Sequence, residues 1–262
     1  MKWDALNPVP GHYRWADADN IVAWAKANDL DVHGHTLVWY AQIPTWIRES
    51  APTLREGHMR EFIDRVLARY ADDVTVWDVV NEALEEDGTL RDSVWQQAMG
   101  PAHIDIAFRQ ARLSAPDATL LYNDYDIAEA GPKAEGLHRL LADMDAADTP
   151  LDGVGFQMHL TASFDAFDEV AENFRRVAEL GLGIWITELD VAMDAGDTEA
   201  MQAAVYRGVL DVCLAEPACK ALQTWGFTDR YSWRKPRTPL ILDPDYRPKP
   251  AYLALQERLA GN

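Results

Sequence analysis

The chain has 262 residues, 48% apolar and 26% charged, enough to bury the core of one large domain or two small ones. Ten Trp, nine Tyr and seven Phe exclude a disordered chain, and no apolar run approaches the 18 residues of a membrane span. The formal net charge is −19. Such a surface repels phosphate backbones and anionic lipids, so we expect neither nucleic acid nor a membrane as partner, whereas a neutral polymer is tolerated.

Short strand-like runs alternate with segments of helical periodicity. Ile21, Trp24 and Ala25 mark an early helix. Strands are then expected at 31–39, 74–81, 119–124, 154–159, 184–189 and 221–227. Apolar residues three and four apart predict the intervening helices, within 62–70, 137–144, 167–177 and 201–212. Pro248 and Pro250 precede a last helix at 252–259.

The expected strands end at intervals of 29 to 42 residues. Strand-then-helix units at this period predict a parallel sheet, either a βα barrel or a doubly wound sheet. Polar or aromatic residues close nearly every strand, which favours the barrel, because a barrel builds its active site from these strand ends. Six strands are expected where a complete barrel has eight. We therefore predict an α/β fold of the TIM (β/α)8 type that is incomplete at its N-terminus.

Two glutamates directly follow strongly apolar strands. Glu82 ends VTVWDVVNE and Glu188 ends GIWITE, where a solvated surface carboxylate is not expected. A salt bridge at the rim explains one such acid equally well, but two at the same mouth favour paired acid/base chemistry. Glycoside hydrolysis needs this pair: one carboxyl protonates the leaving oxygen and the other attacks the anomeric carbon or activates water. Asn81 either bonds a sugar 2-OH or caps the following segment.

Aromatic residues gather at the same strand ends and in the polar loop DRYSWRKPRTP. Flat aromatic rings stack on the apolar faces of pyranose rings while neighbouring polar groups bond the hydroxyls. Trp24, Trp77 and Trp95 are instead assigned to core packing. The rim set is Trp39, Trp46, Tyr125, Trp225, Tyr231 and Trp233.

A metal site is the alternative chemistry. His33 and His35 share one face of a strand, His159 ends another, and Asp229 follows the last, a set that resembles the ligands of a zinc-dependent barrel hydrolase. This interpretation leaves the Asn-Glu pair of VVNE and the aromatic rim without a role. The sequence has no GxSxG elbow, P-loop or GxGxxG turn, which excludes serine hydrolases and nucleotide enzymes.

Seven sequence blocks follow one another in the order found in glycoside hydrolase family 10 endo-xylanases. They are MKWDALNPVPG, HGHTLVWYAQIPTW, WDVVNEAL, LYNDYDI, GVGFQMHL, WITELDVAM and WGFTDRYSW. The chain resembles this family over essentially its whole length. The resemblance implies a single catalytic domain over residues 1–262 that hydrolyses internal β-1,4 bonds of xylan without a metal or other cofactor. It also implies retention of configuration, for which the two carboxyl groups must lie about 5–5.5 Å apart.

The resemblance also implies a role for each matching residue. Glu82 matches the general acid/base and Glu188 the nucleophile. Asn81 matches the residue that bonds the sugar 2-OH, Tyr125 an aromatic on the leaving-group side, and Asp190 the acid that orients His159. Substrate-binding positions around the cleaved sugar are matched by Lys2, His35, Trp39, Gln42, Gln157, His159, Trp225 and Trp233. Xylan and xylo-oligosaccharides are the expected partners.

The two cysteines, Cys213 and Cys219, lie on either side of Pro217. From the residues alone they are either buried thiols or joined across a turn. The resemblance matches them with a disulfide common in the family, which predicts a secreted, extracellular protein. The chain opens without a charged-then-apolar leader, so we expect that a leader is absent from this sequence or that the protein is not exported.

The sequence departs from the family pattern at two places. Tyr40 stands where the family usually has His. MKW matches the end of the second barrel strand, so the first strand, first helix and most of the second strand are expected to be missing, with a Glu-Asn pair that grips the glycone sugar. The strands at 31–39 and 221–227 would then be edges. We expect either a homodimer that covers the open side or a slit that the flanking helices close only partly, and the strongly acidic surface favours the defined dimer. The alternative to an enzyme is an inactive xylan-binding remnant of the same family.

Overall fold

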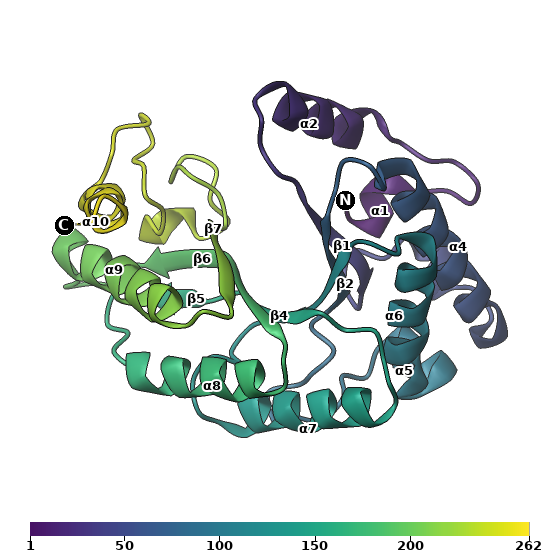
Figure 1. The fold of residues 1–262 in the computed structure, drawn as a ribbon. Coiled ribbons are helices and arrows are strands. Elements are labelled where there is room, and N and C mark those ends of the chain that lie inside the picture. The colour runs from purple at the N-terminus through teal and green to yellow at the C-terminus, as the bar shows by residue number, and fades with distance from the viewer. Residues whose placement is uncertain (262) are drawn as a thin grey trace. The chain divides into compact units, whose positions relative to one another are not determined.

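The computed structural model describes residues 1–261, which form helices and parallel strands in alternation (Figure 1). The strands are β1 (His33–Trp39), β2 (Val76–Asn81), β3 (Thr119–Asp124), β4 (Gly153–Phe156), β5 (His159–Thr161), β6 (Gly183–Ala192) and β7 (Cys219–Thr224). The helices are α1 (Trp3–Leu6), α2 (Ala16–Ala27), α3 (Thr45–Arg48), α4 (Pro52–Tyr70), α5 (Val94–Met99), α6 (Ala102–Ser114), α7 (Pro132–Ala146), α8 (Phe167–Glu179), α9 (Glu199–Ala215) and α10 (Pro250–Leu259), with a short 3-10 turn at Lys235–Arg237.

The chain divides into two compact units. Unit 1 comprises Met1–Asp124 and Glu135–Gly153, and unit 2 comprises Tyr125–Ala134 and the chain from Val154 onward. Each unit has its own set of parallel strands with helices packed against them. None of the helices in the described part of the chain combines the length and hydropathy of a bilayer-spanning segment.

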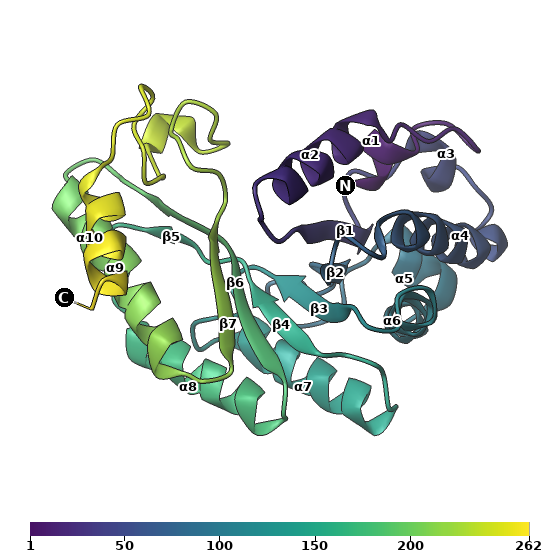
Figure 2. The ribbon, with the colours of Figure 1, turned by 45° about the horizontal axis from the view of Figure 1, so that its top comes forward.

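In unit 1 the strands lie in the order β1-β2-β3, and α4 and α6 pack beside them (Figure 2). The register pairs Trp39 with Asn81, and Asn81 with Asn123. Because parallel strands in register end at the same edge, the last residues of the three strands become neighbours. Glu82, the residue after Asn81, is therefore held at this edge.

The core of unit 1 explains why α4 lies where it does. Proline at its first turn fits the start of a helix, and buried apolar residues then recur three and four positions apart, from Met59 to Tyr70. The ring of Phe62 stacks on Trp3 at 4.2 Å, and Trp3 stacks on Trp95 at 5.2 Å. This aromatic column anchors the N-terminal turn against α4.

In unit 2 the central strand is β6, which pairs with β4, β5 and β7. Helices α8 and α9 pack against β6, and α10 packs on α9. The register pairs His159 with Asp190 and Leu189 with Thr224. The pairing places His159 of β5 beside Asp190 of β6, on the strand that also carries Glu188.

Five of the six expected strands are confirmed as single strands, with ends shifted by up to three residues. The expected strand at 154–159 is wrong as a single strand, because β4 ends at Phe156 and β5 begins at His159. Met158 lies between them with a φ of +59°, a left-handed conformation that cannot continue a strand ladder. The strand expected at 221–227 ends early, and Gly226 has a φ of +102° just beyond it.

The core assignment of Trp24 is wrong, whereas those of Trp77 and Trp95 are confirmed. Helix α2 buries Ala18, Val22 and Ala25, and the Trp24 residue is 63% exposed on another face of the helix. The apolar spacing of Ile21 and Trp24 correctly predicted a helix. It did not identify the buried face.

We expect Gly34→Ala to destabilise the protein by about 1–3 kcal/mol, the usual result of overpacking. Gly34 lies in β1, where an added Cβ would meet the ring of the fully buried Trp77 at 2.2 Å. Urea unfolding followed by tryptophan fluorescence measures the change. Gly57→Ala is the control, because its Cβ would meet nothing within 4 Å in α4 and the swap should stabilise by about 0.5–1 kcal/mol. Equal stability of the Gly34 variant and wild type would contradict the argument.

Candidate active site

In unit 1, Glu82 is buried at the end of β2 and both its carboxylate oxygens accept hydrogen bonds. Trp39 Nε1 donates to Oε2 at 2.9 Å, and Asn81 Nδ2 donates to Oε1 at 3.0 Å. Asn123 Nδ2 donates in turn to Asn81 Oδ1 at 2.8 Å. Three neighbouring strand ends thus fix the direction of one carboxylate.

The backbone of Glu82 is also held in an unusual conformation. Its φ is +57°, a left-handed region that few residues other than glycine adopt. Its N–H donates to Asn123 O at 2.8 Å, and Arg91 Nε donates to its carbonyl at 2.9 Å. Surrounding structure that enforces such a conformation is a common property of functional sites.

A buried carboxylate, that of Asp78, lies within β2 ahead of the strand's last residue, Asn81. Asp78 accepts from His33 Nε2 at 2.9 Å and from His35 Nδ1 at 2.8 Å, both on the adjacent β1. Burial alone would raise the pKa of Asp78, but the charge and hydrogen bonds of the two histidines outweigh it and hold the pKa well below its usual range. Asp78 therefore fixes the ring of His35, which was predicted to bind substrate.

Tyr40, the departure from the family pattern, packs beside Glu82. Its ring meets Trp39 edge-on at 5.9 Å, and the Arg91 guanidinium lies 4.3 Å from its centroid. Burial first, and then the nearby charge of Glu82, raise the pKa of Tyr40. The phenol is therefore neutral at physiological pH, and a cation covers its face.

In unit 2 the buried Glu188 is linked to His159 and Asp190. His159 Nε2 lies 3.3 Å from Glu188 Oε2, and its Nδ1 lies 3.0 Å from Asp190 Oδ2. Asp190 also accepts from Trp233 Nε1 at 2.9 Å and from Arg234 Nη1 at 2.6 Å. One fully buried carboxylate thus orients an imidazole, an indole and a guanidinium.

The charge state of His159 follows from this geometry. Burial alone would lower the pKa of His159, but the hydrogen bonds and charges of Asp190 and Glu188 outweigh it and raise the pKa to about 9. The ring is therefore an imidazolium at neutral pH and donates to both carboxylates. A positive charge lies against Glu188.

The other predicted substrate-binding residues are spread over both units. In unit 1, Lys2 Nζ lies 4.7 Å from the Trp39 ring, and Gln42 is exposed with a φ of +44°. In unit 2, the carbonyl of Gln157 accepts from the Glu188 N–H at 3.1 Å, and the Trp225 ring meets His159 at 6.4 Å. Lys133 Nζ lies 3.1 Å from the centroid of Tyr125.

Two members of the predicted aromatic rim have other surroundings. Trp46 Nε1 donates to Asn7 O at 3.1 Å, and its ring meets His58 edge-on at 5.1 Å. Tyr231 is exposed and lies 3.4 Å from Tyr246, hydroxyl to hydroxyl. Neither of these two hydrogen bonds involves Glu82 or Glu188.

The residues of the zinc alternative are engaged in other bonds. The two histidines of β1 bond Asp78, and His159 bonds two carboxylates. Asp229 accepts from Lys249 Nζ at 3.1 Å and from the Leu240 N–H at 2.8 Å. Within residues 1–261, no group of three or more His, Cys, Asp and Glu side chains has the arrangement of a metal site.

The disulfide implied by the resemblance is present. Cys213, near the end of α9, is bonded to Cys219 at the start of β7, with an S–S distance of 2.05 Å. The bond joins a helix to the strand that follows it. It therefore closes a seven-residue turn around Pro217.

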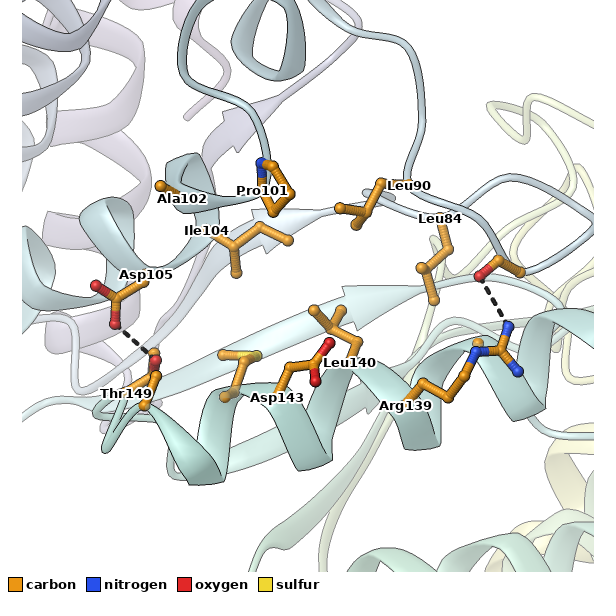
Figure 3. Close-up of a pocket in the computed structure, with 14 residues that line it drawn as sticks. Leu84, Leu90, Pro101, Ala102, Ile104, Asp105, Arg139, Leu140, Asp143 and Thr149 are labelled. Atoms are coloured by element: carbon orange, nitrogen blue, oxygen red, sulfur yellow. Dashed lines mark hydrogen bonds between the residues drawn. The ribbon is translucent and has the colours of Figure 1, made fainter.

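A cavity of about 390 Å³ lies in unit 1 between α6 and α7 (Figure 3). Apolar side chains line it from both sides, with Leu84, Ile104 and Leu140 among them. At its ends Thr149 donates to Asp105 at 2.7 Å and Arg139 donates to the Gly88 carbonyl at 3.2 Å (Figure 3). None of the predicted site residues lines it, and we assign it no part in the chemistry.

Comparison with known proteins identifies the family. The model of glycosyl hydrolase family 10 matches residues 1–258. The chain belongs to glycosyl hydrolase family 10. It is 39% identical to endo-1,4-β-xylanase B of Thermotoga neapolitana, over 98% of this chain and 78% of the relative.

Solved structures of family 10 members match the fold as well. Xylanase 10B of Thermotoga petrophila, solved with xylobiose, gives a TM-score of 0.96 at 38% identity, over 100% of this chain and 83% of that one. The intracellular xylanase of Thermoanaerobacterium saccharolyticum gives 0.93 at 34% identity, over 97% and 84%. The expected TIM-barrel fold class is confirmed by these family 10 structures. The strands expected ahead of Met1 and the single-domain boundary stay predictions.

Four residues that bond to predicted site residues were not themselves predicted: Asp78, Arg91, Asn123 and Arg234. Asp78 carried a signal, since a charged residue in the middle of VWDVV is out of place in an apolar strand unless it has a buried partner. Asn123 could also have been identified from the sequence, because it stands near the end of its expected strand as Asn81 does in the strand before it. Arg91 and Arg234 lie in loops, where no sequence period reveals a contact.

We expect His159 to make stability depend on pH. Its pKa is raised above the ordinary 6.5, so the charged ring stabilises the fold fully below about pH 6.5, and this contribution is lost as the pH rises through about 9. A shift of this size corresponds to about 3 kcal/mol. Urea unfolding should therefore show a steeper loss of stability between pH 6.5 and 9.5 in wild type than in His159→Gln. Parallel pH profiles would contradict the assignment.

Proposed function

We propose that the protein is a retaining endo-1,4-β-xylanase that hydrolyses internal bonds of xylan. The observation that carries this proposal is the pair of buried glutamates, Glu82 directly after β2 and Glu188 within β6, each oriented by hydrogen bonds. Membership of family 10 across residues 1–258 and the names of the matched xylanases support the substrate. Xylo-oligosaccharides are the corresponding small substrates, since the matched structure from T. petrophila holds xylobiose.

Glu188 is assigned as the nucleophile. A carboxylate that attacks an anomeric carbon must be ionised, and the imidazolium of His159 at 3.3 Å stabilises that negative charge. The same contact fixes the orientation of the carboxylate. Asp190 is assigned as the residue that orients His159, through the bond at 3.0 Å.

Glu82 is assigned as the general acid/base. In the first step it gives a proton to the leaving glycosidic oxygen, and in the second it removes a proton from the water that hydrolyses the glycosyl-enzyme. Trp39 and Asn81 hold the two oxygens of this carboxylate, so the proton is delivered from a fixed direction. Retention follows from this double displacement.

The remaining assignments concern substrate binding. Asn81 is assigned to the sugar 2-OH and Tyr125 to the leaving-group side. The sugar at the cleavage site is assigned to Lys2, His35, Trp39, Gln42, Gln157, His159, Trp225 and Trp233. The support is chemical: most of these are indoles, imidazoles and amides, which stack on pyranose faces and bond hydroxyls.

We propose that both units form one catalytic domain, since the family match runs through both without interruption. We also propose an extracellular location. The Cys213–Cys219 disulfide supports it, because such bonds persist in oxidising compartments. An intracellular location remains represented in the family by the xylanase of T. saccharolyticum.

We expect Glu188→Ala to abolish the release of reducing sugar from xylan, because no covalent intermediate can form. Glu82→Ala should lower kcat about 10²–10⁴-fold through the loss of general acid catalysis. In wild type, proton NMR of a xylotetraose digest should show the β-anomer first. Glu61→Ala, which removes an exposed acid paired with Arg65, is the matched control and should keep full activity.

Three outcomes would contradict parts of this proposal. Wild type that binds xylan but releases no sugar would be the inactive remnant. An α-anomer formed first would rule out retention. Activity lost with a chelator and restored by Zn²⁺ would revive the metal hydrolase, in which Asp229→Asn should also abolish turnover.

We further propose the homodimer expected to cover the open side of the barrel, with the exposed apolar residues of α2 as candidate contacts. Ile21 and Trp24 are each well exposed on this helix, and contiguous apolar surface of this kind favours association. Light scattering should give twice the chain mass of 29.5 kDa. Trp24→Ser should yield the monomer, while Leu113→Ser, at an exposed leucine of α6, should not. A monomeric wild type would contradict the proposal.

A further inference from the structure

The segment after β7 is basic, in contrast to the rest of the chain. Between positions 230 and 249 only Asp243 and Asp245 are acidic. The basic residues there are Arg230, Arg234, Lys235, Arg237, Arg247 and Lys249. In a chain of net charge −19, this segment has an excess of basic over acidic residues.

Most of these cations are already neutralised by a carboxylate. The ion pairs are Arg234–Asp190, Arg237–Asp194, Arg247–Asp245 and Lys249–Asp229. Within residues 1–261, Arg230 and Lys235 form no such pair. Of these two, only Arg230 is placed against aromatic rings.

Arg230 belongs to an exposed cluster with three aromatic side chains, Phe227, Tyr231 and Tyr246, which we call the aromatic platform. The Arg230 guanidinium lies 5.3 Å from the centroid of Tyr246. Phe227 meets Tyr246 at 6.1 Å, with ring planes 32° apart, and the two tyrosine hydroxyls are 3.4 Å apart. Tyr231 is 71% exposed and Phe227 54%, so much of both side chains is accessible to a ligand.

The combination of these groups defines the ligand chemistry. Aromatic faces stack on pyranose rings, and an arginine fork binds a carboxylate through two parallel hydrogen bonds. Arg65 offers a contrast: it lies 5.5 Å from the ring of Tyr13, but Glu61 accepts from it at 2.8 Å. At Arg230 no side chain of the described residues supplies that carboxylate.

We propose that Arg230 and the aromatic platform bind a uronic-acid substituent of xylan. The inference rests on the proposed xylanase function and specifies its preferred substrate decoration. Arg230 pairs with the sugar carboxylate while a platform ring stacks on the pyranose face. Trp233, in the network of Glu188, lies only two residues beyond Tyr231, so the platform belongs to the same loop as the proposed site.

Affinity electrophoresis with two polymers tests the proposal. One gel contains glucuronoxylan and the other the same polymer with its carboxyl groups reduced to alcohols; Glu188→Gln is the parent protein, so that the polymer stays intact. The parent should be retarded more by glucuronoxylan. Adding Arg230→Gln should raise the apparent Kd for glucuronoxylan about three- to tenfold, as for one charge-assisted bond at an exposed site, and leave the reduced polymer unaffected.

Two further variants separate stacking from charge. Tyr231→Ala should weaken binding of both polymers, because the ring face does not depend on the carboxylate. Arg65→Gln removes the same charge from another tyrosine and should change neither gel. Loss of binding to both polymers in Arg230→Gln, or to neither, would overturn the proposal.

Hydrolysis of unsubstituted xylotetraose keeps this test distinct from the proposed function. Arg230→Gln in the otherwise wild-type protein should keep kcat/KM on xylotetraose. A wild type that does not cleave xylotetraose would refute the proposed function, while the two gels would still report on the platform. Circular dichroism checks that each variant is folded.

Discussion

The buried carboxylate of Asp190 is the constraint on which the surroundings of Glu188 depend. A fully buried carboxylate is costly unless cations and hydrogen-bond donors surround it, and His159, Arg234 and Trp233 meet that requirement. One acid thus fixes His159 and the adjacent Trp233 and Arg234, which lie far from His159 in the sequence. The protonated ring of His159 places a positive charge beside Glu188. The groups that stabilise the buried Asp190 therefore also set the charge next to the proposed catalytic carboxylate.

Unit 1 solves a similar problem with different residues. Asp78 is buried between His33 and His35, and the pair of strands that carries them is locked in register by this contact. Glu82 lies four residues further on, and its two carboxylate oxygens accept hydrogen bonds from an indole and an amide. This contrast matches the proposed division of labour, because a group that must carry a proton is better served by neutral neighbours than by a cation.

The sequence predicted site residues and elements well where apolar residues recur at helical spacing or where an apolar strand ends. Glu82, Asn81 and His159 were found because each stands where an apolar strand stops. The interruption at Met158 was missed, since its side chain is apolar and only its backbone breaks the ladder. Trp24 was misassigned because a helix with apolar residues on more than one face does not reveal which face is buried. Arg91 and Arg234 were missed because loop contacts join residues that no local pattern relates.

The loop that follows β7 shows how one segment can serve both stability and recognition. Two of its basic residues form ion pairs that hold the loop to the rest of unit 2: Arg234 with Asp190, and Lys249 with Asp229. The same loop has more basic residues than these acids require, in a protein whose surface is otherwise strongly acidic. Arg230 packs on the ring of Tyr246 and forms no ion pair within residues 1–261, which is the arrangement on which the proposed carboxylate ligand rests. Xylan is neutral except where a uronic acid decorates it. A cation on the protein can therefore distinguish a decorated xylan chain from an undecorated one.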